Sequence, residues 1–269
     1  MKVINLYDKN SDIRSYGRNI FKATEEVLAM FPDEYGECYY KNLESLELIQ
    51  VDKLINASLL GYYDDEANVI FFRDKNAMGH EMFHMTSNDL ENGNYAFLSK
   101  MGIENGLIEG MTEYFNTKAY YLEIPSAYQF EVFCVTMLED IPNIFRPYFK
   151  PNSKEFISLF PNKKDIYSLL YSLNTYNDLF LKYMEEYYSG KDITNNSKEF
   201  KLVIHDVLTN LIDIELSIEK DPDMLRKYGY KFMDYIGGDK IPSLTDDIYP
   251  NVYEYADKLI DKKIRKRKI

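Results

Sequence analysis

The feature that most constrains this chain is the five-residue run His80-Glu81-Met82-Phe83-His84. On a helix, two histidines four positions apart lie on the same face, so both imidazole rings can point at one metal ion. Glu81 can reach a metal-bound water from the side. We therefore predict a helix over 76–87 that carries two zinc ligands, His80 and His84, and the general base of a hydrolase, Glu81.

A catalytic zinc site needs a third protein ligand, and the chain contains only three histidines. Residues 103–123 have helical spacing, and Glu109 and Glu113 share one face of that helix. We assign metal ligation to Glu109. Glu113 is expected to accept the free ring N–H of a ligating histidine, with Glu104 or Glu123 as alternatives if the helix register differs. The apolar face of this helix would comprise Leu107, Met111, Tyr114 and Phe115.

With these residues the chain resembles the gluzincins, a group of zinc peptidases that includes thermolysin-like enzymes and neutral aminopeptidases. The resemblance covers about residues 54–121. It implies a zincin-like fold, a zinc ion and a peptide substrate. It also implies a glutamate ligand on a later helix, here Glu109, and an acidic residue four positions on, here Glu113, that holds the first histidine. The Glu109-Gly110 step is similar to the ligand signature of the aminopeptidases, with Ile108 in place of their Asn.

The segment before the motif contains the signal of a β-hairpin. Apolar runs at 59–63 and 68–72 flank the acidic turn Asp64-Asp65-Glu66-Ala67. In zincins the active-site helix follows a sheet whose edge strand lies along the cleft and pairs with an extended substrate, as in many peptide binders. One of the two strands is expected to be that edge. The alternative is an ordinary hairpin that precedes a helix.

The rest of the chain predicts an α+β fold. Residues 11–31 have the spacing of an amphipathic helix. Residues 43–51 alternate in part and are expected to form a strand. With the hairpin, this strand would give a mixed or antiparallel sheet of three or four strands, covered by the first helix. We expect a small sheet lobe over 1–88 that carries the active-site helix, and a larger helical lobe over 89–269 that carries Glu109. Further helices are expected over 127–140, 153–160, 164–188, 197–219, 222–236 and 249–266, and a polar loop over 88–102.

Charge and composition limit the classes of partner that the protein is expected to bind and the cellular compartment in which it is expected to occur. A net charge of −12 argues against nucleic acid as the main partner, because phosphate binding needs a basic face. The basic run 262–268 is interpreted as a solvated end, with contact to RNA or an anionic membrane as the alternative. The sequence shows no candidate membrane span, and the first residues lack the apolar core of a signal peptide. Cys38 and Cys134 are therefore expected to be free thiols in a cytoplasmic protein.

The donor that would stabilise an oxyanion is the least determined residue of the expected site. His205 lies among Leu202, Leu208 and Ile212, a pattern typical of a buried helix face, which favours a core histidine over a catalytic one. The other candidates are Tyr128 and Tyr121, with Tyr120 beside them.

The sequence thus predicts a zinc-dependent metallopeptidase with one Zn²⁺ per chain and a peptide or protein substrate, in which Glu81 deprotonates a metal-bound water. A catalytically inactive zincin-like binding protein that holds a protein partner on its helical lobe is the alternative, and the intact Glu81 argues against it. A structural zinc site is disfavoured because three ligands without a nearby Cys or fourth His leave one position open.

Overall fold

The computed structural model describes residues 2–5, 13–54, 59–93, 105–122, 127–190 and 197–218, with 257, 258, 260–262 and 265. The chain divides into two compact units. Residues 1–102, 111–127 and 143–153 form unit 1, and residues 103–110, 128–142 and 154–269 form unit 2. Each unit is made of three separate segments of the chain. The sequence analysis instead expected two continuous lobes, 1–88 and 89–269. Over the described residues the protein is α+β, as predicted.

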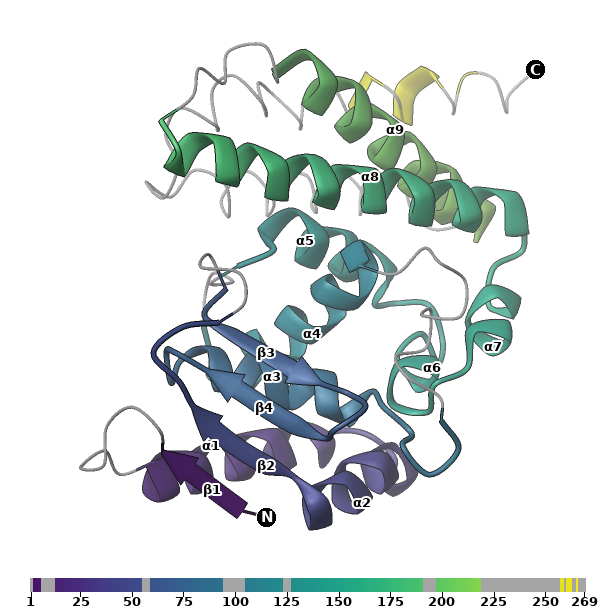
Figure 1. Ribbon diagram of the computed structural model, residues 1–269. Helices are drawn as coiled ribbons and strands as arrows, with labels where there is room; N and C mark the ends of the chain where they lie inside the picture. The colour runs from purple at the N-terminus through teal and green to yellow at the C-terminus, as the bar shows by residue number, and fades with distance from the viewer. Residues whose placement is uncertain are drawn as a thin grey trace. The chain divides into compact units, whose positions relative to one another are not determined.

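Unit 1 contains a mixed four-stranded sheet in the order β1-β2-β4-β3 (Figure 1). Strands β1 (Lys2–Asn5), β2 (Glu47–Gln50) and β4 (Val69–Phe72) are parallel to one another. Strand β3 (Gly61–Asp64) pairs antiparallel with β4 and forms an edge of the sheet. The predicted hairpin and the predicted sheet of three or four strands are both confirmed.

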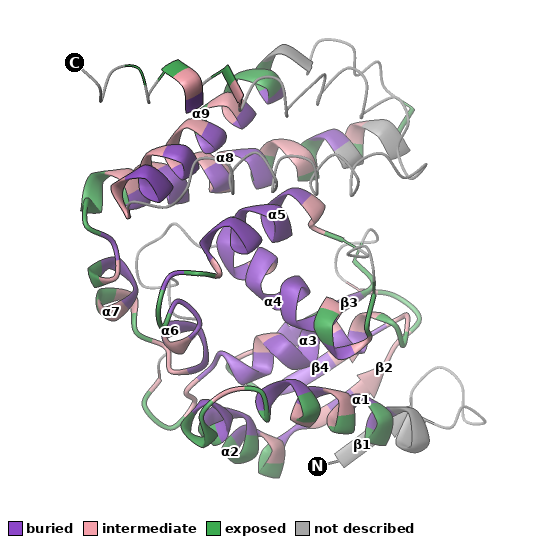
Figure 2. Ribbon diagram, turned by 180° about the vertical axis from the view of Figure 1, so that it is seen from behind, coloured by how far each residue is buried: buried purple, intermediate pink, exposed green. Residues whose placement is uncertain are grey.

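Helices α1 (Ile13–Leu28), α2 (Glu37–Ser45) and α3 (Ala77–Thr86) cover one face of this sheet (Figures 1 and 2). The 3₁₀ turn η1 (Asp33–Gly36) and helix α6 (Arg146–Phe149) also belong to unit 1. Figures 1 and 2, taken from opposite sides, show α1, α2 and α3 on the same face. The strand side chains in register on that side, such as Leu48, Ile70 and Tyr63, are buried, because alternate residues of a strand point to one face.

Helix α2 corrects part of the predicted strand over 43–51. Residues 43–45 end this helix, and the strand begins only at Glu47. The buried residues Cys38, Tyr39 and Asn42 have helical spacing, and the Asn42 side chain anchors the helix. Its Nδ2 donates to the carbonyls of Met85 at 3.0 Å and Asn88 at 2.7 Å. This tertiary contact outweighs a weak local alternation.

Unit 2 is helical over its described residues. Helices α5 (Gln129–Leu138), α7 (Ser153–Ser158), α8 (Lys163–Tyr188) and α9 (Ser197–Ser217) lie within a few residues of the predicted ranges. Helix α4 (Asn105–Ala119) contributes its first residues to unit 2 and the remainder to unit 1. The predicted helix over 222–236 lies outside the described residues, as do most of 249–266, most of the basic run 262–268 and the loop residues 94–102. Among the described helices, none has the length and apolarity needed to cross a bilayer.

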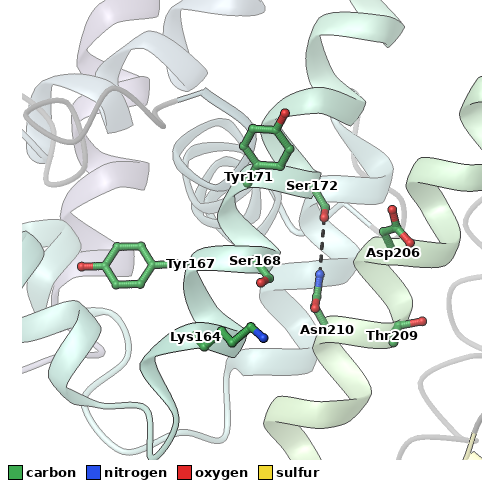
Figure 3. Close-up of a pocket in the computed structure, with 8 residues that line it drawn as sticks. All are labelled: Lys164, Tyr167, Ser168, Tyr171, Ser172, Asp206, Thr209 and Asn210. Carbon is green, nitrogen blue, oxygen red and sulfur yellow. Dashed lines mark hydrogen bonds between the residues drawn. The ribbon is translucent and has the colours of Figure 1, made fainter.

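Helices α8 and α9 bound a surface pocket (Figure 3). Its walls carry hydroxyl and amide groups, and Asn210 Nδ2 donates to Ser172 Oγ at 3.4 Å. Tyr167 and Tyr171 are exposed beside it. The lining of this pocket includes none of the residues assigned to the predicted site.

The core of unit 2 contains a carboxyl group, Glu131 on α5, that burial keeps protonated at neutral pH. The residue is 2% exposed, and burial raises its pKa from 4.5 to about 8, with a smaller contribution from the charge of Glu109. Its Oε1 has no hydrogen-bond partner among the described residues. The two cysteines, Cys38 and Cys134, are buried free thiols whose pKa is raised by burial.

Glu131 predicts a pH-dependent stability. The folded protein holds a proton that the unfolded chain releases near pH 4.5, so the free energy of unfolding should fall as pH rises from about 4.5 to about 8. The loss attributable to this group should be about 5 kcal/mol over that window. Glu131→Gln, which mimics the neutral acid, should lose this decline. Urea unfolding of both proteins in chelator at several pH values measures it, and equal slopes would contradict the prediction.

Candidate metal centre

Helix α3 presents His80 and His84 on one face, as the four-residue spacing predicts. The ring centroids are 4.8 Å apart and the two Nε2 atoms are 3.1 Å apart. Met78, Met82 and Phe83, on the remaining sides of the helix, are fully buried and fix its rotation. The two imidazoles therefore lie on the part of α3 that keeps some exposure.

Helix α4 carries a polar stripe whose members are spaced by three or four residues. Most residues of this helix are buried, on its polar side as well as on its predicted apolar face. Polar groups on a buried helix must find hydrogen-bond or metal partners, or they destabilise the fold. The stripe consists of Glu109, Thr112, Glu113 and Asn116.

Glu113 is 1% exposed and accepts hydrogen bonds from three groups. Its Oε2 accepts from His80 Nδ1 at 3.0 Å and from Asn116 Nδ2 at 3.1 Å, and its Oε1 accepts from the backbone N–H of Ala127 at 3.3 Å. A carboxylate beside Nδ1 favours the proton on that nitrogen, which leaves the lone pair of the neutral ring on Nε2. The structure thus places Glu113 against the first histidine, where the resemblance put it.

The outer nitrogen of His84 faces a hydroxyl group. Thr112 Oγ1 lies 3.4 Å from His84 Nδ1 and 2.9 Å from the Tyr148 hydroxyl. Tyr148 in turn donates to the carbonyl of Phe83 at 2.8 Å, and both Thr112 and Tyr148 are fully buried. The sequence analysis missed both residues. Thr112 could have been found as a member of the α4 stripe, but Tyr148 lies 36 residues further on and has no local signal.

His80, His84 and Glu109 each offer one ligand atom, and these atoms all lie within 4.8 Å of one another. Bonds of 2.0–2.1 Å in a tetrahedral site would hold ligand atoms about 3.4 Å apart, close to the Nε2–Nε2 distance of 3.1 Å. Two neutral ring nitrogens whose lone pairs face each other at this distance repel unless a cation or a proton lies between them. The donor set and its spacing therefore fit a metal ion.

Glu81 lies on α3 directly beneath the edge strand β3. It is 8% exposed, and a Cβ built on Gly61 would stand 2.8 Å from its Oε1 and 2.9 Å from the Cβ of Ala77. Only glycine lets the strand pass this close to the helix. The edge strand therefore runs immediately beside the carboxylate that the sequence analysis assigned as general base.

A second glycine brings α3 and α4 together. A Cβ on Gly79 would stand 2.7 Å from Asn116 Oδ1 and 2.6 Å from the ring of Tyr120. The absence of a side chain at this position lets α3 approach α4 closely enough for His80 to reach Glu113.

The three candidate oxyanion donors occupy different environments. Tyr121 is 77% exposed, and Tyr128 precedes α5 with a positive φ of 49°. His205 corrects its predicted placement on a buried helix face: its side chain is 42% exposed and its Nδ1 lies 3.3 Å from Asp206 Oδ1. The buried stripe of α9 passes through Ile204, Val207, Leu208 and Leu211 instead. The alternatives Glu104 and Glu123 lie outside the described residues.

Comparisons with protein-family models, with curated proteins and with solved structures find no match to this chain. The function is therefore argued from the geometry and chemistry of the site.

Proposed function

We propose that this protein is a zinc-dependent metallopeptidase with a zincin-like catalytic core. One observation carries the proposal. His80 and His84 direct their Nε2 atoms at each other across 3.1 Å, while their Nδ1 atoms face hydrogen-bond partners, and the Glu109 carboxylate lies within 4.8 Å of both. Two imidazoles and one carboxylate form a ligand set typical of catalytic zinc.

The donor set favours zinc over the other common divalent cations. Mg²⁺ and Ca²⁺ prefer oxygen ligands, whereas two neutral imidazoles suit Zn²⁺. Three protein ligands leave a position open for water or substrate. When bound by His80, His84 and Glu109, the ion would supply Lewis acidity and lower the pKa of a bound water.

Glu81 supplies the proton transfers in this proposal. Its carboxylate is adjacent in sequence to the first histidine and is not one of the three candidate ligands. It would accept a proton from the attacking water and later deliver that proton to the leaving amine. Its low exposure limits competition from bulk water.

The edge strand supports a peptide as the substrate. Strand β3 has β4 on one side and forms an edge of the sheet, so its other side can pair with an extended backbone. Gly61 places this strand against Glu81. Leu59, Leu60 and Tyr62 are exposed along it and could contact substrate side chains.

The first prediction concerns metal content. Protein purified without chelators should hold about one zinc per chain, and the His80→Ala/His84→Ala variant should hold almost none, because two of three ligands are lost. His205→Ala is the matched control, since His205 pairs with Asp206 outside the cluster and should leave the zinc content unchanged. Elemental analysis measures all three proteins. Stoichiometric zinc in the double variant would overturn the site.

The second prediction concerns the general base. Glu81→Gln should keep zinc and fold but lose at least about a hundredfold in peptide hydrolysis, because the nearly isosteric amide cannot take a proton. Glu66→Gln, which changes an exposed carboxylate in the β3–β4 turn, serves as the control and should retain activity. Turnover of a generic peptide library measures the effect. A wild type that hydrolyses no peptide yet binds a cellular protein tightly would favour the binding-protein alternative.

The third prediction separates the two glutamates of α4. Glu109→Ala should nearly abolish zinc binding because it removes a ligand. Glu113→Ala should weaken zinc affinity about ten- to a hundredfold, since the ligands remain while His80 loses the acceptor that orients its ring. Titration against a competing chelator distinguishes the two. If Glu113→Ala lost zinc outright and Glu109→Ala retained it, the two roles would be exchanged.

A further inference from the structure

The hydroxyl groups beside His84 form a chain whose direction can be worked out from its buried end. The carbonyl of Phe83 can only accept, so Tyr148 donates to it at 2.8 Å. The single proton of Tyr148 is thereby used. The contact of 2.9 Å between Tyr148 and Thr112 then needs the Thr112 proton, because two oxygens this close without a proton between them repel.

Thr112 can then only accept from His84. With its own proton directed at Tyr148, the Thr112 oxygen offers a lone pair to His84 Nδ1, 3.4 Å away. This contact is long for a hydrogen bond, but the buried partners on both sides leave one favourable orientation. When a cation binds the two Nε2 atoms, the proton of the His84 ring therefore belongs on Nδ1, where the Thr112 oxygen accepts it. Without a cation, the contact of 3.1 Å needs a proton between the two Nε2 atoms, and this proton comes from His84 because Glu113 holds the His80 proton on Nδ1.

We propose that Thr112 and Tyr148 are positioning residues that set the tautomer of His84 for metal binding. This inference rests on the proposed zinc site and extends it, because it gives His84 a partner of a different kind from that of His80. Glu113 fixes the first ring with a charge, whereas an uncharged hydroxyl chain that ends on the carbonyl of Phe83 fixes the second. Tyr148 acts on the ring through Thr112.

The chain predicts an effect at a distance that packing alone would not produce. In Tyr148→Phe the Thr112 hydroxyl loses its acceptor and can turn to donate to His84 Nδ1. This stabilises the tautomer with the proton on Nε2, which cannot bind a metal, so the zinc affinity should fall. The Phe83 carbonyl stays satisfied in this variant, because it also accepts from Thr86 Oγ1 at 2.7 Å. The zinc affinity should therefore fall although Tyr148 acts on the ring through Thr112.

Zinc titration against a competing chelator tests this in four variants. We expect Thr112→Val and Tyr148→Phe to lose about tenfold in zinc affinity, because both remove the acceptor that favours a proton on His84 Nδ1. Thr112→Ser keeps the hydroxyl and should retain most of the wild-type affinity. Thr24→Val removes another buried threonine hydroxyl, which donates within α1, and should leave the zinc affinity unchanged.

An unchanged zinc affinity in Thr112→Val or in Tyr148→Phe would overturn this inference even if the wild type binds zinc. A Thr112→Ser variant as weak as Thr112→Val would overturn it as well, because the hydroxyl would then have no role. A wild type that binds no zinc would instead overturn the proposed function, and this inference with it.

Discussion

Two imidazole nitrogens of α3 that face each other at 3.1 Å are the constraint on which the candidate metal site depends. Left to itself, a pair of neutral rings would relieve this contact by rotating a ring or by sharing a proton. Here each ring is held from its outer nitrogen, His80 by the Glu113 carboxylate and His84 by the Thr112 hydroxyl. The surroundings therefore keep open a position that suits a cation, which is the sense in which the site is preorganised.

This arrangement accounts for the polar stripe of α4, four polar residues on one side of a helix that is buried on most sides. Unsatisfied, each buried polar group would cost about 1–3 kcal/mol. Three members of the stripe, Thr112, Glu113 and Asn116, contact one another or the histidines through hydrogen bonds. The fourth, Glu109, is the member that keeps partial exposure, as a ligand to an accessible ion requires. Hydrogen bonds thus connect the stripe to both histidines, through Glu113 to His80 and through Thr112 to His84.

Features that arise from a local periodic pattern could be predicted from the sequence, whereas features that depend on contacts between distant residues could not. The spacing of His80 and His84, the hairpin around 64–67 and the long helices follow from periodicity of two or of 3.6 residues. Helix α2 was missed because its anchor, Asn42, bonds to carbonyls more than 40 residues away. His205 was placed wrongly because a helical stripe can be rotated by one residue without changing its apolar count. Tyr148 carried no signal, since its role exists only through Thr112 and Phe83.

Glu109 of the candidate site has a second carboxyl group near it, Glu131 of α5. Glu109 and Glu131 influence each other electrostatically, yet only Glu109 belongs to the cluster that could hold a metal. Full burial raises the pKa of Glu131 to about 8, so at neutral pH it is largely uncharged. A neutral Glu131 adds no repulsion against Glu109 and is a poor competitor for a cation.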